Sequence, residues 1–510
     1  MAQVFPFRAF RYNPARAPFD RVLTQPYDKI SPAMQEKYYA ADPHNLIAVE
    51  KGRANPNDTP QNNVYTRAAA SLQDWIRNGI VQQDPAPSFY AYSQEYTVPG
   101  TDERRTRRGF IGAGQLEDYS ARVVFRHEQT LSGPKADRLE LLRHTQTHTG
   151  QLFMLYSDPH RRADEILAEA ETSAPEAELC DEYGVTHRLW IISRPQRVAA
   201  IQKAMHDQKL VIADGHHRYE TALAYRNECR SHAGKTDPEA PYERVMMTFI
   251  NTHSEGLTIL PTHRVASHIH DFSWPAVRRH LEPWFTAEEF PFSNDAQKAE
   301  ARKKFLACLA GAREQHEVRV AHAVGERVVS VPDGVAGRGA SVPNAVSKHD
   351  AGAPAGSGRD VSAPQAASVR AIGVYPADGS SNHGVGTPTT SGRAFYVLTL
   401  RDGANLNQLL PNVSPLQREV DVVLLHEGIL EPALGITPQA VTAEAHLTYE
   451  REAAAALDAV DSGRAQISFL LNPCAVDQVM KIATAGEVMP QKSTDFYPKL
   501  LSGITMYRLA

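Results

Sequence analysis

The pattern of apolar and polar positions predicts a mixture of strands and helices in the first half of the chain. Tyr90, Tyr92 and Tyr96 fall on one side of residues 89–98, which is the alternation of a half-buried strand. Residues 66–78 instead repeat apolar side chains at helical spacing and stop at a glycine. The same patterns predict strands at 109–116, 121–125 and 190–192, and helices at 132–144 and 195–206. Strands that alternate with helices favour an α/β core.

The most informative stretch covers residues 209–223, KLVIADGHHRYETAL. Four apolar residues at 210–213 predict a short buried strand, and apolar positions after the turn approximate a helical period. A helix that starts directly after a glycine turn presents free backbone N–H groups and the positive end of its dipole to an anion. The turn itself is polar: Asp214, Gly215, His216, His217 and Arg218. We therefore predict a site for a phosphorylated ligand here.

Each side chain of this turn suits one part of such a site. His216, His217 and Arg218 would hold phosphate oxygens, and Asp214 would bind a magnesium ion that offsets the charge. Three adjacent residues cannot easily aim three ligands at one metal, so a zinc site is a poor fit. The alternative is an ordinary turn in which Asp214 caps the helix and the histidines pack locally.

A second candidate is Glu128, which follows the apolar residues 123–125 together with His127. A carboxylate at the end of a strand can act as a general base if burial raises its pKa towards the working pH. The alternative is that Glu128 simply pairs with Arg126 or Lys135.

Two further polar groups follow apolar stretches and are candidate substrate-binding residues. One comprises Thr262, His263 and Arg264, and the other comprises Lys492, Ser493 and Thr494, with Lys499 beyond them. Residues 486–493 almost match a P-loop, but Gln491 replaces its second glycine and Pro490 lacks an N–H donor. We therefore reject a P-loop.

Helical patterns dominate beyond residue 273, with helices predicted at 275–281, 296–310, 439–449 and 450–460. Residues 331–393 differ, because they contain no leucine and a single aromatic residue and are rich in small residues and proline. Such a segment cannot bury enough apolar surface to offset its ordering entropy. We expect a disordered insertion between two strands, 318–329 and 394–400, of one domain. A linker between independent domains is the alternative.

Composition narrows the class of protein. A chain of 510 residues is expected to form about two or three domains. The net charge of -5 argues against a dedicated nucleic-acid binder. The four cysteines form no C-x-x-C pair, which fits a reducing compartment, and neither a signal peptide nor a membrane-spanning run is evident. A cytoplasmic protein without a membrane or nucleic-acid partner is therefore expected.

Six motifs together resemble the domain-of-unknown-function-1015 (DUF1015) family of bacterial and archaeal proteins. They are PFRAFRYNP at 6–14, QPYDKISP at 25–32, RHEQTLSGPKADRLELL at 126–142, IADGHHRYETAL at 212–223, LPTHR at 260–264 and MPQKSTDFYPKLLSG at 489–503. They span nearly the whole chain except for the insertion at 331–393.

Within residues 123–226, the H-E pair followed by D-G-H-H-R is similar to the ParB/sulfiredoxin-like nucleotide-binding fold of free-serine kinases. This resemblance implies that Glu128 is the catalytic base, with His127 beside it. It also implies that residues 214–218, including Gly215, form the phosphate cradle.

The fold class expected is α+β. It would comprise an N-terminal α/β region at 1–120, a ParB/sulfiredoxin-like core at 121–265 and a largely helical C-terminal α+β domain at 266–510. The expected function is transfer of a phosphoryl group from ATP or ADP, with Mg²⁺, to the hydroxyl of a small metabolite such as free L-serine.

Two alternatives stay open at this point. One is a non-catalytic or slowly hydrolysing nucleotide switch. The other is a DNA-binding relative of ParB, which the acidic net charge and the absence of a recognisable helix-turn-helix disfavour. The expected partners are a nucleotide and a small-molecule substrate, and the sequence leaves open whether the chain forms a homo-oligomer.

Overall fold

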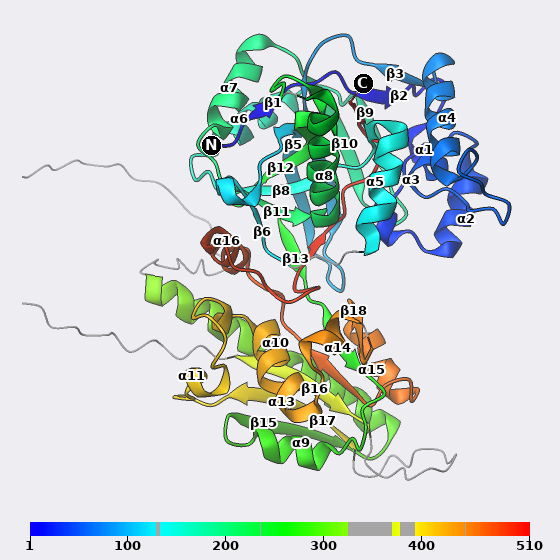
Figure 1. The fold of residues 1–510 in the computed structure, drawn as a ribbon. Helices are drawn as coiled ribbons and strands as arrows, with labels where there is room; N and C mark the ends of the chain where they lie inside the picture. Colours follow the sequence, from blue (N-terminus) through cyan, green and yellow to red (C-terminus); the bar gives the residue numbers. More distant parts are fainter. Residues whose placement is uncertain (129–132, 235, 325–369, 378–392, 444, 510) are drawn as a thin grey trace, which may run out of the picture.

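The computed structural model describes residues 1–128, 133–234, 236–324, 370–377, 393–443 and 445–509. Figure 1 shows two bodies, an upper one that contains both chain termini and a lower one built from much of the second half of the chain. The fold is mixed α+β, as the sequence predicts.

The upper body is built on a nine-stranded mixed sheet. Parallel pairing joins β6 to β11 and β8 to β12, and the other pairs are antiparallel. Across the sheet the strands are β6 (Val124–Arg126), β11 (Leu210–Asp214), β8 (Leu152–Tyr156), β12 (Arg244–Asn251), β5 (Arg104–Gln115), β4 (Phe89–Thr97), β10 (Thr186–Ile192) and β9 (Ala177–Cys180), with β1 (Val4–Phe5) against β5.

Side chains of the central strands alternate between two buried faces. Leu210 and Ile212 of β11 join one core, and Val211 and Ala213 join another. The first core also takes side chains from α6 (Arg162–Ala170), α7 (Pro195–Met205) and α8 (His216–Ala233). The second takes side chains from the N-terminal region, α5 (Gly133–Thr145) and the C-terminal segment. Burial on both faces explains why β11 is apolar without interruption.

Short elements of the N-terminal region pack beside this sheet. They are β2 (Phe10–Tyr12), α1 (Phe19–Val22), η1 (Tyr27–Lys29), α2 (Pro32–Ala41), α3 (Ile47–Glu50), α4 (Val64–Arg77) and β3 (Val81–Gln83). The helix expected at 66–78 is α4, and the strand expected at 89–98 is β4. Because β4 and β5 pair between β10 and β12, the domain boundary expected after residue 120 falls inside one sheet.

The lower body contains helices and a six-stranded antiparallel sheet, which the expectation of a largely helical C-terminal α+β domain does not describe in detail. Short apolar runs are compatible with either element, and here pairing between distant segments makes them strands. The strands in order are β15 (Phe285–Phe292), β17 (Arg393–Leu400), β16 (Ala371–Pro376), β19 (Ile467–Leu470), β14 (His263–Ala266) and β18 (Leu447–Glu450). The helix expected at 439–449 is therefore a short α14 (Pro438–Thr442) followed by β18.

Other helices of this region are α9 (Trp274–Leu281), α10 (Asp295–Val324), α11 (Leu406–Leu409), α12 (Asp421–Leu425), η5 (His426–Leu430), α13 (Glu431–Leu434), α15 (Ala453–Asp461) and α16 (Val476–Ala485). The strand expected at 318–329 is wrong as far as residue 324, because α10 continues to that residue.

Part of the expected insertion at 331–393 is an ordered strand. β16 lies between β17 and β19, and its Ile372, Val374 and Tyr375 are fully buried. The prediction of disorder is therefore wrong for residues 371–376, whose few apolar side chains all enter the core. Residues 331–369 and 378–392 lie outside the described part of the chain.

The C-terminal segment returns from the lower body to the upper one. β20 (Asp495–Tyr497) pairs with β13 (Thr258–Leu260), and β21 (Tyr507–Arg508) pairs with β7 (Thr147–His148). The predicted domain at 266–510 therefore includes a segment that pairs with strands of the upper body. Among the helices of the described residues, none has both the length and the apolar character needed to cross a bilayer.

Candidate functional site

Three segments far apart in sequence meet at one edge of the nine-stranded sheet. β6 and β11 are parallel neighbours, so Glu128 and Asp214 emerge from their carboxyl ends at the same edge. Met489 of the C-terminal segment adds a third strand-like contact, because its N–H donates to the carbonyl of His127 at 2.7 Å. The two predicted centres of chemistry, at 128 and at 214–218, therefore share one site.

Gly215 sets the geometry of the turn before α8. Its φ is +93°, in the left-handed region that favours glycine. A Cβ at this position would lie 2.9 Å from Leu152 Cδ2. The helix that follows has no side-chain cap, because the Asp214 carboxylate accepts only the N–H of Gly215, at 2.8 Å. The alternative in which Asp214 caps the helix is therefore wrong, and the first N–H groups of α8 carry no side-chain cap.

Two imidazole nitrogens at this helix start also lack partners. Nε2 of His216 and Nε2 of His217 are buried, and neither forms a hydrogen bond with the residues that the structure describes. Burial, with the neighbouring charge of His127, lowers the pKa of His216 to about 3, so its ring is neutral at physiological pH. An unsatisfied buried polar atom is destabilising, which makes two of them at one helix start a sign of a ligand.

Glu128 is held by the C-terminal segment. Its Oε1 accepts the N–H of Thr494 at 3.1 Å and the hydroxyl of Thr494 at 3.2 Å, and His127 Nε2 lies 3.6 Å away. Burial alone would raise the pKa of Glu128, but the bond and charge of His127, the charge of His216 and the N–H of Thr494 lower it to about 2. The expected upward shift is therefore wrong, and Glu128 is ionised.

His127 joins the three segments. One ring nitrogen, Nδ1, lies 2.6 Å from the carbonyl oxygen of Ile212 in β11. The other, Nε2, lies 2.7 Å from the hydroxyl of Thr494. The ring is fully buried and packs edge-on against His216, with centroids 4.9 Å apart. His127 therefore positions its neighbours, and both of its nitrogens already have partners.

Asp214 faces cations. Its Oδ2 lies 3.4 Å from Lys499 Nζ and 3.9 Å from Arg218 Nη2. Burial would raise the pKa of Asp214, but the charges of Lys499 and Arg218 lower it well below its usual range. Oδ1 of Asp214 accepts the N–H of Gly215 and Oδ2 faces the two cations, so a magnesium ion at this carboxylate stays a prediction.

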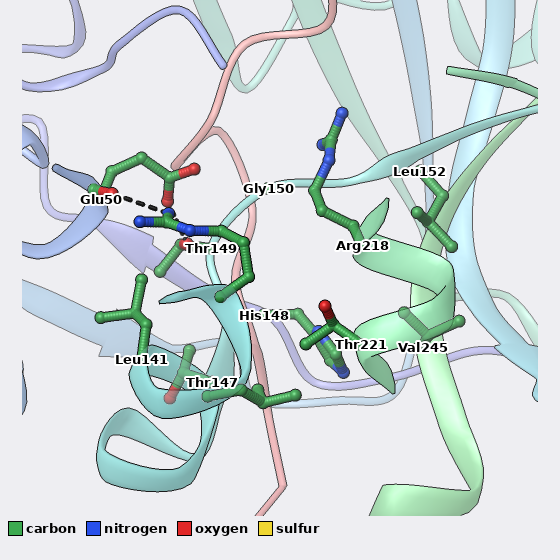
Figure 2. A pocket seen from close by; sticks show the side chains of 12 residues that line it. Glu50, Leu141, Thr147, His148, Thr149, Gly150, Leu152, Arg218, Thr221 and Val245 are labelled. Atoms are coloured by element: carbon green, nitrogen blue, oxygen red, sulfur yellow. Dashed lines mark hydrogen bonds between the residues drawn. The ribbon is translucent and has the colours of Figure 1, made fainter. Parts of the chain in front are cut away.

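The Arg218 side chain extends from α8 towards the carbonyl of Gln151. Its Nη1 donates to the carbonyl of Gln151, and the side chain lines a separate cavity together with Glu50, Thr149 and Thr221 (Figure 2). Residues 216 and 218 differ by about 200° around a helix, so these side chains leave α8 on different sides. The structure therefore does not place the Arg218 fork beside the imidazole of His216.

The chain matches the family model described as "Protein of unknown function (DUF1015)" over residues 4–337. This chain belongs to the DUF1015 family. The match ends before the C-terminal segment that supplies Thr494 and Lys499 to the site of this DUF1015 protein. Among curated proteins, none matches the chain.

Several solved structures are similar to this DUF1015 protein. A conserved hypothetical protein from Pyrococcus furiosus is 10% identical with a TM-score of 0.26, over 73% of this chain and 87% of its own. A free serine kinase in complex with AMP is 10% identical with a TM-score of 0.28, over 73% and 83% of the two chains. A mutant of a free serine kinase in complex with ADP is 9% identical with a TM-score of 0.29, over 73% and 84%.

The substrate-binding candidates of the DUF1015 chain divide into two groups. Thr494 contacts Glu128, and the charge of Lys492 acts on His217. Ser493, by contrast, is buried and donates to the carbonyl of Pro490.

The group at 262–264 has structural contacts. Nδ1 of His263 accepts the N–H of Leu471 at 3.2 Å, and the carbonyl of Thr262 accepts from Arg264. Arg264 is fully buried and also donates to the carbonyl of Gln491 at 3.2 Å. It braces the C-terminal segment, and His263 is not part of the site.

Lys29 is a cation near this site that was not identified from the sequence. Lys29 lies close enough for its pKa to be affected by the charges of Lys499, Asp495 and Asp214. The apolar and polar pattern around Lys29 resembles that of any surface turn and gave no signal. The sequence feature that could have identified Lys29 is its position in the QPYDKISP motif.

Proposed function

We propose that this DUF1015 protein is a phosphotransferase that moves a phosphoryl group from ATP or ADP to the hydroxyl of a small metabolite, with free L-serine as the first acceptor to test. The observation that carries this proposal is the uncapped start of α8, where His216 Nε2 and His217 Nε2 have no partner among the described residues, beside ionised Glu128. In the same proposal, residues 121–265 form a ParB/sulfiredoxin-like core.

Phosphoryl transfer asks the protein mainly for positioning and for neutralisation of charge. The N–H groups of α8 and of the two imidazoles would bind phosphate oxygens, and the helix dipole adds positive potential. Lys499 Nζ lies 3.4 Å from Asp214 Oδ2 and adds a positive charge beside the carboxylate that was predicted to bind magnesium. These groups would bind the phosphates of the donor, with magnesium as the expected counter-ion.

Glu128 would orient the acceptor. A carboxylate with a pKa of about 2 is a weak base, but it accepts a hydrogen bond from an alcohol and aims the oxygen at phosphorus. In a loose transition state the proton leaves the alcohol late, so a weak base is sufficient. Oε1 already accepts two bonds from Thr494, which fixes the carboxylate in place.

A nucleotide-dependent switch is the second candidate. The low pKa of Glu128 favours the switch, because this carboxylate is a weak base. Thr494 also links Glu128 to a segment that returns from the lower body. Nucleotide binding would then change an association with a partner and would form no phosphorylated metabolite.

The test is phosphorus NMR of the full chain with ATP or ADP, magnesium chloride and hydroxylated metabolites including L-serine. We expect a new phosphomonoester signal, and Glu128→Gln should lower its rate by about 10²–10⁴-fold while nucleotide binding persists. Glu255→Gln, at an exposed position, is the matched control. Hydrolysis alone, or no reaction, would favour the switch, and normal turnover of Glu128→Gln would remove Glu128 from the mechanism.

A further inference from the structure

A second cleft opens beside Lys499. It is lined by side chains from four parts of the chain and holds about 390 Å³ of empty space, its open mouth included. The residues that matter for its chemistry are Gln25, Lys29, Asp181, Arg451, Tyr497 and Lys499. Because Lys499 also pairs with Asp214, the cleft adjoins the proposed phosphoryl-transfer site.

Two of its three cations are already neutralised. Lys499 Nζ lies 3.1 Å from Asp495 Oδ1 as well as 3.4 Å from Asp214 Oδ2. Arg451 Nε donates to the other oxygen of Asp495 at 2.6 Å. These pairs fix both cations at the wall of the cleft and leave them little capacity to attract another anion.

Lys29 is different. Within the part of the chain that the structure describes, its ammonium forms no hydrogen bond or ion pair, although it is half-buried. Burial and the charge of Lys499 lower its pKa, and the charges of Asp495, Asp28 and Asp214 oppose this only in part. A partly desolvated ammonium without a counter-ion is unfavourable, and an anion in the cleft would relieve it.

The carboxylate of the cleft is not free to bind a ligand. Asp181 Oδ2 accepts from Gln25 Nε2 at 3.0 Å and lies 3.2 Å from His187 Nε2. Its Oδ1 accepts the N–H groups of Tyr183 and Val185, each at 2.9 Å. All four contacts come from the protein, so the cleft presents an open ammonium but no open carboxylate.

We infer that Lys29 anchors an oxyanion, a carboxylate or a phosphate monoester, carried by the acceptor substrate. The acceptor is then a small hydroxyl compound with a negative group, and an ammonium on it is neither required nor recognised in this cleft. That the anion belongs to the acceptor rests on the proposed function. The binding of the anion itself does not depend on phosphoryl transfer.

The experiment is titration calorimetry of the full chain without nucleotide, using four probes that separate the groups: glycerate, L-serine, ethanolamine and glycerol 3-phosphate. We expect glycerate and L-serine to bind with similar affinity and ethanolamine to show no binding. Tight binding of glycerol 3-phosphate with weak binding of glycerate would assign the site to a phosphate, and the opposite order to a carboxylate.

Variants of Lys29 test whether its ammonium binds the anion. Lys29→Gln should weaken binding of the preferred anion by about tenfold or more, and Lys29→Arg should retain most of it. Lys37→Gln, at an exposed position of α2, is the matched control, and thermal unfolding of each variant checks its fold. Binding of ethanolamine as tight as that of glycerate, or unchanged binding in a folded Lys29→Gln, would overturn the inference. Failure of phosphoryl transfer alone would overturn only the proposed function.

Discussion

Gly215 shows how the absence of a Cβ atom shapes the turn between β11 and α8. Its φ of +93° and the 2.9 Å from a hypothetical Cβ to Leu152 Cδ2 exclude a side chain for two separate reasons. Gly215→Ala should destabilise the protein by about 2–4 kcal/mol, from backbone strain and overpacking together. Gly184→Ala, at φ +75° with open space around it, isolates the strain. Urea unfolding should show the larger loss at Gly215, and equal losses would mean that the contact with Leu152 is unimportant.

His216 makes stability depend on pH. Its pKa falls from 6.5 in the unfolded chain to about 3 in the folded protein, because burial disfavours the charged ring. Between these values the unfolded chain binds a proton that the native state does not, so stability increases with pH and is lost as pH falls below 6.5. His216→Gln should reduce the slope of unfolding free energy between about pH 4 and about pH 6 by about 1.4 kcal/mol per unit.

The measurement is urea unfolding across that range, with His206→Gln, which removes an exposed imidazole, as the control. A slope that stays unchanged in His216→Gln would show that the ring does not titrate differently in the two states.

Residue chemistry was predictable where it depends on near neighbours. The polar turn at 214–218 was recognised from its own letters, because a strand, a glycine and a helix start are local features. The direction of the Glu128 pKa shift was not, because the bond and charge of its neighbour His127, the charge of His216 and the N–H of Thr494 together outweigh burial, and only the fold brings His216 and Thr494 to Glu128.

At the scale of elements, β16 is the most informative difference. Its six residues stand in a stretch of small residues, yet pairing with β17 and β19 buries them completely. Ile372→Ala should destabilise the lower sheet by about 2–4 kcal/mol, because a fully buried side chain leaves a cavity. Leu400→Ala, at a half-buried end of β17, should have a smaller effect in the same urea titration. An equally small effect at Ile372 would contradict a buried strand.

Elements with strong local patterns were predictable, and β16 shows the limit. α4 and α7 have helical spacing over three turns or more, and the structure has them near the expected bounds. α8 begins directly after the glycine turn, as expected. The sheet partners of a six-residue strand are not written in its own sequence, so composition alone gave the wrong state for residues 371–376.

At the scale of the whole molecule, Lys499 ties the chain end to the turn after β11. Its ion pair with Asp214 is mostly buried and spans 285 positions of sequence (499 − 214). Lys499→Met and Asp214→Asn should each destabilise the protein by up to about 3 kcal/mol, and the double variant by less than their sum, because each single change removes one counter-charge of a mostly buried pair. Asp495 still faces Lys499 and Arg218 still faces Asp214 after these changes.

Urea unfolding of the four proteins gives the coupling energy, expected at about 1–3 kcal/mol. The exposed pair Arg77–Asp74 is the matched control and should couple by less than about 0.5 kcal/mol. Additive losses of unfolding free energy for the Lys499 and Asp214 variants would show that this ion pair does not contribute to stability.

The sequence by itself determined the elements with strong periodicity, the mixed α+β class, the family and the polar turn at 214–218, because each of these depends on residues close together in the chain. Only the tertiary structure decided that Glu128 is ionised, that Asp214 faces Lys499, and that Lys29 borders the site. Thr494 and Lys499, which contact Glu128 and Asp214, belong to a segment hundreds of positions away in the chain and meet these residues only in the folded protein.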